Sequence, residues 1–131
     1  MKPKIKLKPW GREIWFAATA HYAGKILEVK KGARLSLQFH EQKEETQFLF
    51  SGKVRLTFGL DAKKLRTKIL NPGDVFHIPP KTIHRIEGVA PLSKIFEVST
   101  PQLDDVVKLA DDYGRSGAGN DEKLDRKLAR K

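Results

Sequence analysis

Short runs of apolar or alternating residues fill the chain between residues 25 and 100, and turn residues separate these runs. Alternation with a period of two over about four to eight residues indicates half-buried strands. We expect strands at residues 13–16, 25–29, 34–40, 46–50, 53–58, 65–70, 75–78, 83–87 and 93–99. Turns rich in Gly and Pro, such as those at 51–52 and 71–74, lie between them. The pattern predicts an all-β sandwich or barrel.

The pattern changes after the last expected strand. Leu103, Val106, Val107 and Ala110 follow helical spacing, which predicts a short helix over residues 102–113 that ends at Gly114. Residues 116–131 begin with small residues and continue with dense charge, so we expect a flexible tail or a frayed helix there. The expected organisation is a basic N-terminal arm or strand at 1–12, a barrel with its helix at 13–115, and a charged tail at 116–131.

Composition narrows the classes of function. A chain of 131 residues with 39% hydrophobic residues is suited to one domain. Cys is absent, so a thiolate metal site and a thiol nucleophile are excluded. No apolar run of roughly 18 residues and no signal peptide is visible, so we expect a cytoplasmic protein without membrane contact. The net charge of +10 is concentrated at the termini and lacks interleaved aromatic residues, which makes nucleic acid an unexpected partner.

Four residues form a candidate metal site. The expected strand at 34–40 places Ser36, Gln38 and His40 on one face, because alternate residues of a strand point the same way. Glu45 comes just before the next expected strand, and His84 follows a rigid turn that contains two prolines. An amide oxygen, two imidazoles and a carboxylate suit Zn, Mn, Fe, Ni or Co better than Ca or Mg. We therefore expect one divalent metal ion on Gln38, His40, Glu45 and His84.

The spacing of these residues resembles the two motifs of the cupin superfamily. The first motif matches Gly32, Gln38, His40, Glu45 and Gly52, and the second matches Gly73, Pro79 and His84. Two positions depart from the motifs: Gln38 stands where a His is usual, and Lys81 stands where a Gly is usual. The resemblance implies an all-β fold, the cupin double-stranded β-helix or jelly-roll barrel, with a short C-terminal helix.

A narrower resemblance extends over roughly residues 8–115. The segments 8–11, 35–40, 78–80, 84–85 and 111–115 are similar to those of type II mannose-6-phosphate isomerases. That family uses a Gln, His, Glu and His set, which implies the same four metal ligands here. It also implies reversible aldose–ketose isomerisation of a phosphosugar, in which the metal orients substrate oxygens and a general base moves a proton. Lys43, Glu44 and His77 are the nearest candidates for the base, and the sequence does not choose between them.

Other functions stay open at this point. A metal-dependent cupin dioxygenase using iron or nickel is one alternative, although Gln38 in place of a His argues against it. A non-catalytic module that binds a sugar or an anion, as a partner of a nucleotidyltransferase, is another. Small cupins resemble dimers in which an N-terminal strand passes to the neighbouring subunit, so we expect a homodimer. Lys81 is either an exposed turn residue or a phosphate contact, and Arg115 either covers a substrate or docks the C-terminal helix.

Overall fold

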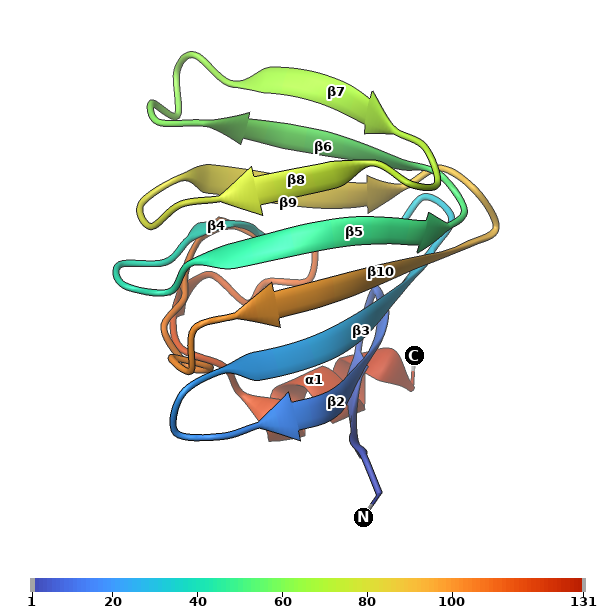
Figure 1. The fold of residues 1–131 in the computed structure, drawn as a ribbon, viewed down its shortest axis with the longest axis vertical. Helices are drawn as coiled ribbons and strands as arrows, with labels where there is room; N and C mark the ends of the chain where they lie inside the picture. Colours follow the sequence, from blue (N-terminus) through green and yellow to red (C-terminus); the bar gives the residue numbers. More distant parts are fainter. Residues whose placement is uncertain (1, 131) are drawn as a thin grey trace.

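A computed structural model describes residues 2–130, so residues 1 and 131, at the ends of the expected arm and tail, lie outside it. Two sheets face each other, and a short helix lies beside them (Figure 1). The first sheet has the order β1 (Lys4–Lys8), β2 (Gly11–Ala18), β3 (Ala23–Lys30), β10 (Leu92–Ser99), β5 (Glu45–Ser51) and β8 (Val75–Ile78). The second has the order β12 (Gly117–Ala118), β11 (Val107–Ala110), β4 (Leu37–Phe39), β9 (Ile83–Gly88), β6 (Val54–Gly59) and β7 (Arg66–Leu70). The all-β prediction is confirmed.

The nine strands expected from alternation are all present, with ends that differ by a few residues. Of these nine, the strand expected at 34–40 is the shortest in the structure, where only Leu37–Phe39 forms a regular strand. Before it, Arg34 makes an isolated bridge to Glu87, and the Leu35 amide donates to the carbonyl of Ile86 at 3.0 Å. The backbone there follows the sheet without a continuous ladder, so the segment still carries Gln38 and His40 to the position that the motif requires.

The C-terminal helix exists but lies later in the chain than expected. Residues 102–113, expected as a helix, contain turns and β11, which pairs with β4 in the register Val107 to Phe39. The helix α1 is Glu122–Ala129, inside the segment expected to be a flexible tail or a frayed helix, and the side chain of Asp121 caps it by accepting from the Leu124 amide. Pairing with an existing sheet outweighs the weak helical periodicity of 102–113, because tertiary contacts override local propensity.

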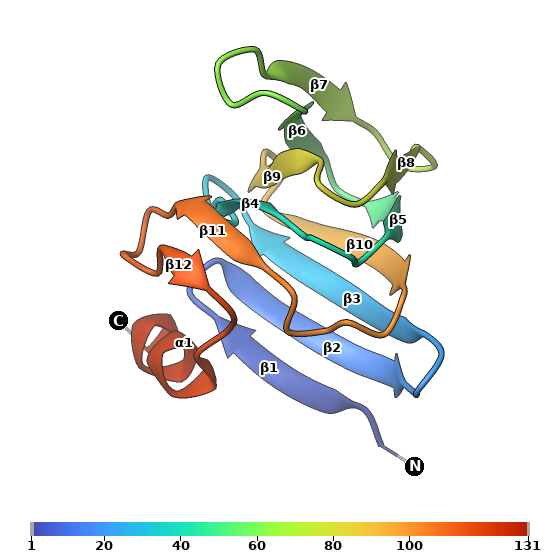
Figure 2. The same cartoon turned by 90° about the vertical axis from the view of Figure 1, so that its left-hand side faces the viewer.

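The N-terminal segment is part of the first sheet. β1 pairs antiparallel with β2 of the same chain, from Lys4 opposite Trp15 to Lys8 opposite Gly11. In Figure 2 the helix α1 lies beside β1, and the two elements are in contact. Within the described residues, no helix has both the length and the apolar character needed to cross a membrane.

The space between the sheets is apolar at one end and polar at the other. Leu27, Ile95 and Leu49 lie opposite one another on β3, β10 and β5 and are buried. Two residues along each strand, Lys25, Glu97 and Gln47 form the neighbouring layer and are also buried. Inward-pointing side chains repeat every second residue of a strand. On each of these strands, one inward residue belongs to the apolar core and the next one lines the polar cavity. The candidate site lies in this polar half.

Candidate metal centre

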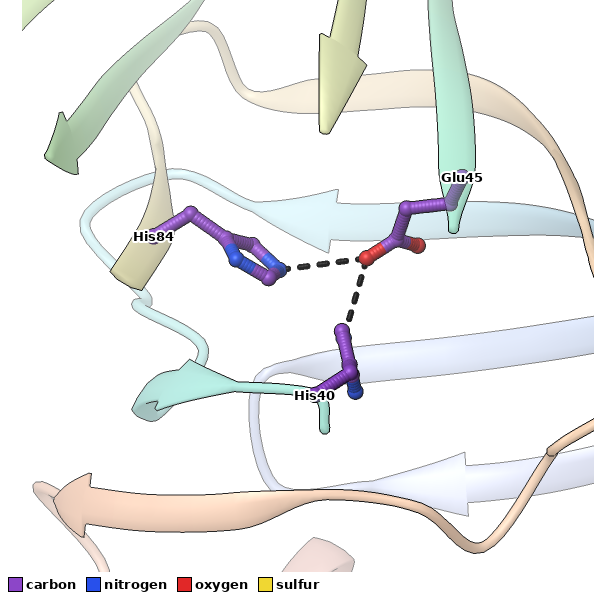
Figure 3. A group of neighbouring side chains, drawn as sticks. All are labelled: His40, Glu45 and His84. Atoms are coloured by element: carbon purple, nitrogen blue, oxygen red, sulfur yellow. Dashed lines mark ion pairs between the residues drawn. The ribbon is translucent and has the colours of Figure 1, made fainter. Parts of the chain in front are cut away.

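Three of the four expected ligands converge in the polar half of the barrel (Figure 3). Glu45 is the first residue of β5, His84 lies on β9 of the other sheet, and His40 directly follows β4. The Glu45 Oε1 atom is 3.0 Å from Nε2 of His40 and 3.2 Å from Nε2 of His84. All three side chains are buried, and one candidate ligand atom from each lies within 4.8 Å of the others. The two sheets together therefore assemble the cluster.

Hydrogen bonds orient both imidazoles toward Glu45. Nδ1 of His40 donates to the carbonyl of Asp105 at 2.5 Å, and Nδ1 of His84 donates to the carbonyl of Thr82 at 2.9 Å. Because a carbonyl can only accept, these bonds place the ring hydrogen on Nδ1 and leave the Nε2 lone pairs facing the carboxylate. Nε2 of His40 and Oε1 of Glu45 are buried and have no hydrogen-bond partner. Converging acceptors of this kind fit a divalent cation.

Gln38 lies beside this cluster. It pairs with His84 in the register between β4 and β9, and its side chain lines the same cavity as the three ligands. Its amide oxygen accepts a hydrogen bond of 2.7 Å from the hydroxyl of Ser36. The strand alternation that predicted a shared face for Ser36 and Gln38 agrees with this contact. Its role as a fourth ligand stays a prediction.

A buried ion-pair network supports Glu45 from behind. The Lys43 ammonium lies 3.7 Å from Glu45 Oε2 and 3.5 Å from Glu97 Oε2, and Gln47 donates to Glu97 at 3.0 Å. Burial opposes the ionisation of Glu45, but the neighbouring Lys43 ammonium holds the pKa of Glu45 well below its usual range. Burial and the neighbouring charge of Glu45 raise the pKa of Glu97 to about 7. The network therefore keeps Glu45 as the ionised carboxylate.

Asp105 positions the loop that carries His40, and the sequence analysis did not identify this role. Its carboxylate accepts hydrogen bonds from the backbone amides of Glu41, Gln42 and Lys43, at 3.1, 2.7 and 2.9 Å. Its carbonyl also accepts the hydrogen bond from His40. The sequence analysis placed Asp105 near the start of an expected helix. Acidic residues are common in that position, so nothing in the sequence indicated another role for Asp105. Only the fold brings it to the loop 65 residues earlier in the sequence.

Of the three candidates for the general base, one lines the cavity and two lie at the surface. Lys43 lines the cavity. Glu44 and His77 are half-exposed and contact each other at 2.6 Å, outside the residues that line the cavity. Lys81 is exposed and does not line the cavity either. Arg115 contacts the C-terminal helix, which is one of its two expected roles, and it also lines the cavity. Its contact with a substrate stays a prediction.

The cavity around the cluster is small and rich in cations. It encloses about 60 Å³, which is room for water molecules but far below the roughly 300 Å³ of a pocket for a drug-sized ligand. Six basic side chains line it together with the candidate ligands: Lys8, Lys25, Lys43, Arg85, Lys108 and Arg115. The other lining carboxylates are Glu13 and Glu97. The lining therefore carries more positive than negative groups.

Comparisons with known proteins give a consistent result. The sequence model described as "Mannose-6-phosphate isomerase C-terminal" matches residues 3–111. Mannose-1-phosphate guanylyltransferase of Escherichia coli K12 is 34% identical over 112 residues, which are 82% of this chain and 22% of that protein. The alginate biosynthesis protein AlgA of Pseudomonas aeruginosa is 34% identical over 114 residues, 83% of this chain and 22% of the relative. The chain thus spans about a fifth of the length of these relatives.

A solved structure shows the same fold. Oxalate decarboxylase of Bacillus subtilis, with Mn(II) centres, aligns with a TM-score of 0.67 and 23% identity. The alignment covers 83% of this chain and 30% of that chain. At this identity the likeness concerns the fold alone.

Proposed function

The chain belongs to the mannose-6-phosphate isomerase C-terminal family and has the cupin fold, and on this premise we propose that it is a metal-dependent aldose–ketose isomerase of a phosphosugar. The observation that carries the proposal is the convergence of His40, Glu45 and His84 on one point inside the barrel. The family description supports the substrate class, since mannose 6-phosphate is a phosphosugar.

The metal part of the proposal assigns one divalent ion to His40, Glu45 and His84, with Gln38 as the fourth ligand. Mixed nitrogen and oxygen donors suit Zn, Mn, Fe, Ni or Co. Mn is the first ion to test, because the oxalate decarboxylase with the same fold has Mn(II) centres. When bound, such an ion polarises carbonyl and hydroxyl oxygens of a substrate. The protein's own contribution is to orient both imidazoles through Asp105 and Thr82.

Lys108 supports an anionic substrate. Its side chain is buried and donates to the carbonyl of Gly119 and, at 3.3 Å, to the side-chain oxygen of Asn120. Within the described residues, no carboxylate lies within ion-pair distance of it. Burial, Arg115 and Lys8 lower the pKa of Lys108, which means that its positive charge is unfavourable where it lies. A phosphate group entering the cavity would relieve this cost.

A phosphosugar needs more room than the cavity provides. A volume of about 60 Å³ is far below the roughly 300 Å³ of a pocket for a drug-sized ligand. Arg115 and Asn120 are lining residues that come from the segment between β11 and α1. Lys43 also lines the cavity, and although burial opposes its charge, Glu97 and Glu45 hold the pKa of its ammonium above the usual range.

The metal assignment is tested by elemental analysis of the protein purified without a tag or chelator. We expect close to one equivalent of a divalent metal in the wild type and less than a tenth of that in His40→Ala and Glu45→Gln. His77→Ala is the matched control, because this histidine is half-exposed and outside the cavity. Equal metal contents in His40→Ala and the wild type would refute the assignment.

The reaction is tested with the metal-loaded protein by following the interconversion of mannose 6-phosphate and fructose 6-phosphate. We expect turnover in the wild type and a KM at least about 10-fold higher in Lys108→Gln, because a charge-assisted contact to phosphate is lost. Lys81→Gln is the control, since this lysine is exposed. Absence of both turnover and binding would exclude the isomerase. Binding that stabilises the fold without turnover would favour the non-catalytic sugar-binding module instead.

A further inference from the structure

A buried polar layer lies on the inner face of the first sheet, next to the candidate metal centre. Lys25 on β3 lies opposite Glu97 on β10, and Glu97 lies opposite Gln47 on β5, and these three strands run side by side in Figure 1. Gln47 follows Glu45 by two residues on β5, so both side chains point to the inside of the barrel. The backbone positions of these two residues are about 6.8 Å apart, since a strand advances about 3.4 Å per residue. We call Lys25, Glu97 and Gln47 the polar layer.

The amide oxygen of Gln47 is a buried acceptor that no described residue satisfies. Gln47 is 4% exposed and lines the cavity. Its amide nitrogen donates to Glu97 Oε1 at 3.0 Å, which turns the amide oxygen away from Glu97. Nε2 of His40 and Oε1 of Glu45 share this lack of a partner, and both face the candidate metal position. An unsatisfied buried acceptor destabilises a fold, so one that faces a cavity indicates a donor that enters from the cavity.

The neighbours of this amide oxygen select the chemistry of the donor. An anionic group would lie against an acceptor oxygen and the Glu97 carboxylate, so a phosphate is unfavourable there. The Lys43 ammonium, 3.5 Å from Glu97 Oε2, and Lys25 in the same layer oppose a second cation. A neutral hydroxyl donates one hydrogen bond and brings no charge. The position therefore fits a hydroxyl, of a water molecule in the free protein or of a bound ligand.

We propose that Gln47 is a specificity-determining residue, whose amide oxygen accepts a hydrogen bond from one hydroxyl of the sugar. This role rests on the proposed function, because it uses the same cavity and the same class of substrate. Aldose–ketose isomerisation changes only the first two carbon atoms of a sugar, and the cluster that contains Glu45 serves that end. Gln47 lies two residues further along β5, so it contacts the hydroxyl at the third or the fourth carbon. That hydroxyl is unchanged in the reaction, so Gln47 selects the sugar without taking part in the chemistry.

The folding cost of the polar layer supports a role in recognition. Leu27, Ile95 and Leu49 form the adjacent layer on the same three strands and are buried. Apolar residues could continue this layer, since replacing buried charged groups by apolar ones of similar volume is often neutral or stabilising. A binding site, in contrast, needs a few polar groups held on rigid elements. β5 is paired on both sides, with β10 and β8, so Gln47 is held on such an element.

The test measures, by titration calorimetry, how the metal-loaded protein binds mannose 6-phosphate and two analogues that lack the hydroxyl at the third or at the fourth carbon. Each sugar is brought to its isomerisation equilibrium beforehand, so that only binding releases heat. We expect one analogue to bind the wild type at least about 5-fold more weakly than mannose 6-phosphate, because one hydrogen bond is lost.

Gln47→Met removes the acceptor and keeps a side chain of similar length. In this variant mannose 6-phosphate should bind at least about 5-fold more weakly than in the wild type, and the difference between it and that analogue should disappear. Gln42→Met is the matched control, because Gln42 is exposed and lies outside the residues that line the cavity. It should keep the discrimination of the wild type.

The loss of discrimination separates recognition from a structural role. If Gln47 only holds Glu97 in place, Gln47→Met should weaken the binding of all three sugars equally, and this result would overturn the proposal. A wild type that binds both analogues as tightly as mannose 6-phosphate would overturn it too. That second measurement needs no variant, so it decides the case even where Gln47→Met does not fold.

The interconversion assay reports on the proposed function separately. Discrimination that depends on Gln47 in a protein without turnover would support the role of Gln47 in binding and count against the isomerase. Turnover without discrimination would support the isomerase and overturn the role of Gln47. A wild type that binds none of the three sugars would overturn both.

Discussion

Lys81 takes a backbone conformation that glycine adopts more easily. Its φ angle is 68°, and it is the only described non-glycine residue with a positive φ. The cupin motif has a Gly at this position. The Lys81 amide donates to the carbonyl of His40 at 2.6 Å, so the turn that precedes His84 is tied to His40. The left-handed conformation costs a non-glycine residue about 1–2 kcal/mol. This strained turn brings His84 close to His40.

Lys81→Gly should therefore stabilise the protein. We expect the free energy of unfolding to rise by about 0.5–1 kcal/mol, because the relief of strain exceeds the extra entropy of Gly in the unfolded chain. Urea unfolding at a fixed metal concentration measures it. Lys81→Ala retains the strained conformation and is the control. A Lys81→Gly variant less stable than Lys81→Ala would contradict this account of the turn.

At the scale of elements, ion pairs connect the C-terminal helix to β1 and to Arg115. Asp125 of α1 is buried and lies 2.7 Å from Lys8 of β1 and 3.1 Å from Arg115. At the edge of this contact, Glu122 pairs with Lys6 at 3.1 Å and is more exposed. Arg115 links the helix to the cavity that it lines. Arg115 therefore contacts both the helix and the cavity.

Asp125→Ala should release this helix. We expect the free energy of unfolding to fall by about 3 kcal/mol, because two buried cations lose their shared carboxylate. Hydrogen exchange of residues 117–129 should also become faster. Glu122→Ala is the control, since an exposed pair contributes less than about 1 kcal/mol. Equal exchange rates in Asp125→Ala and the wild type would show that other contacts hold α1.

At the scale of the whole molecule, the barrel joins an apolar half that stabilises the fold to a polar half that carries the site. The buried cluster around Val29, Leu56 and Ile86 holds the two sheets together. On the same strand as Ile86, His84 faces Glu45 in the polar half. Converging acceptors and buried charges destabilise a fold unless they are compensated. An ion at this site would therefore act on the stability of the whole domain.

Metal binding should raise the thermal stability. At a free metal concentration of 100 times Kd, we expect about 2.7 kcal/mol of added stability and a higher Tm by calorimetry. A chelator should reverse the change, since a ligand that binds only the folded state stabilises it by mass action. His40→Ala should show no response to metal or chelator. A rise in Tm of the same size in His40→Ala would place the ion elsewhere.

The sequence by itself determined the features that depend on local spacing. Alternation located the nine strands between residues 13 and 99, since side chains of a strand change face at every residue. Motif spacing identified His40, Glu45 and His84, which lie together in the structure. The spacing suffices because both motifs sit on strands whose ends meet inside one barrel.

Only the tertiary structure decided the features that depend on partners far apart in the chain. The apolar residues around Val107 follow helical spacing, but pairing with β4 made this segment a strand. Asp105 became the anchor of the His40 loop, and Lys108 became a buried cation, through contacts that the local sequence does not encode. Local pattern specifies which side of an element is buried, whereas long-range packing chooses what covers it.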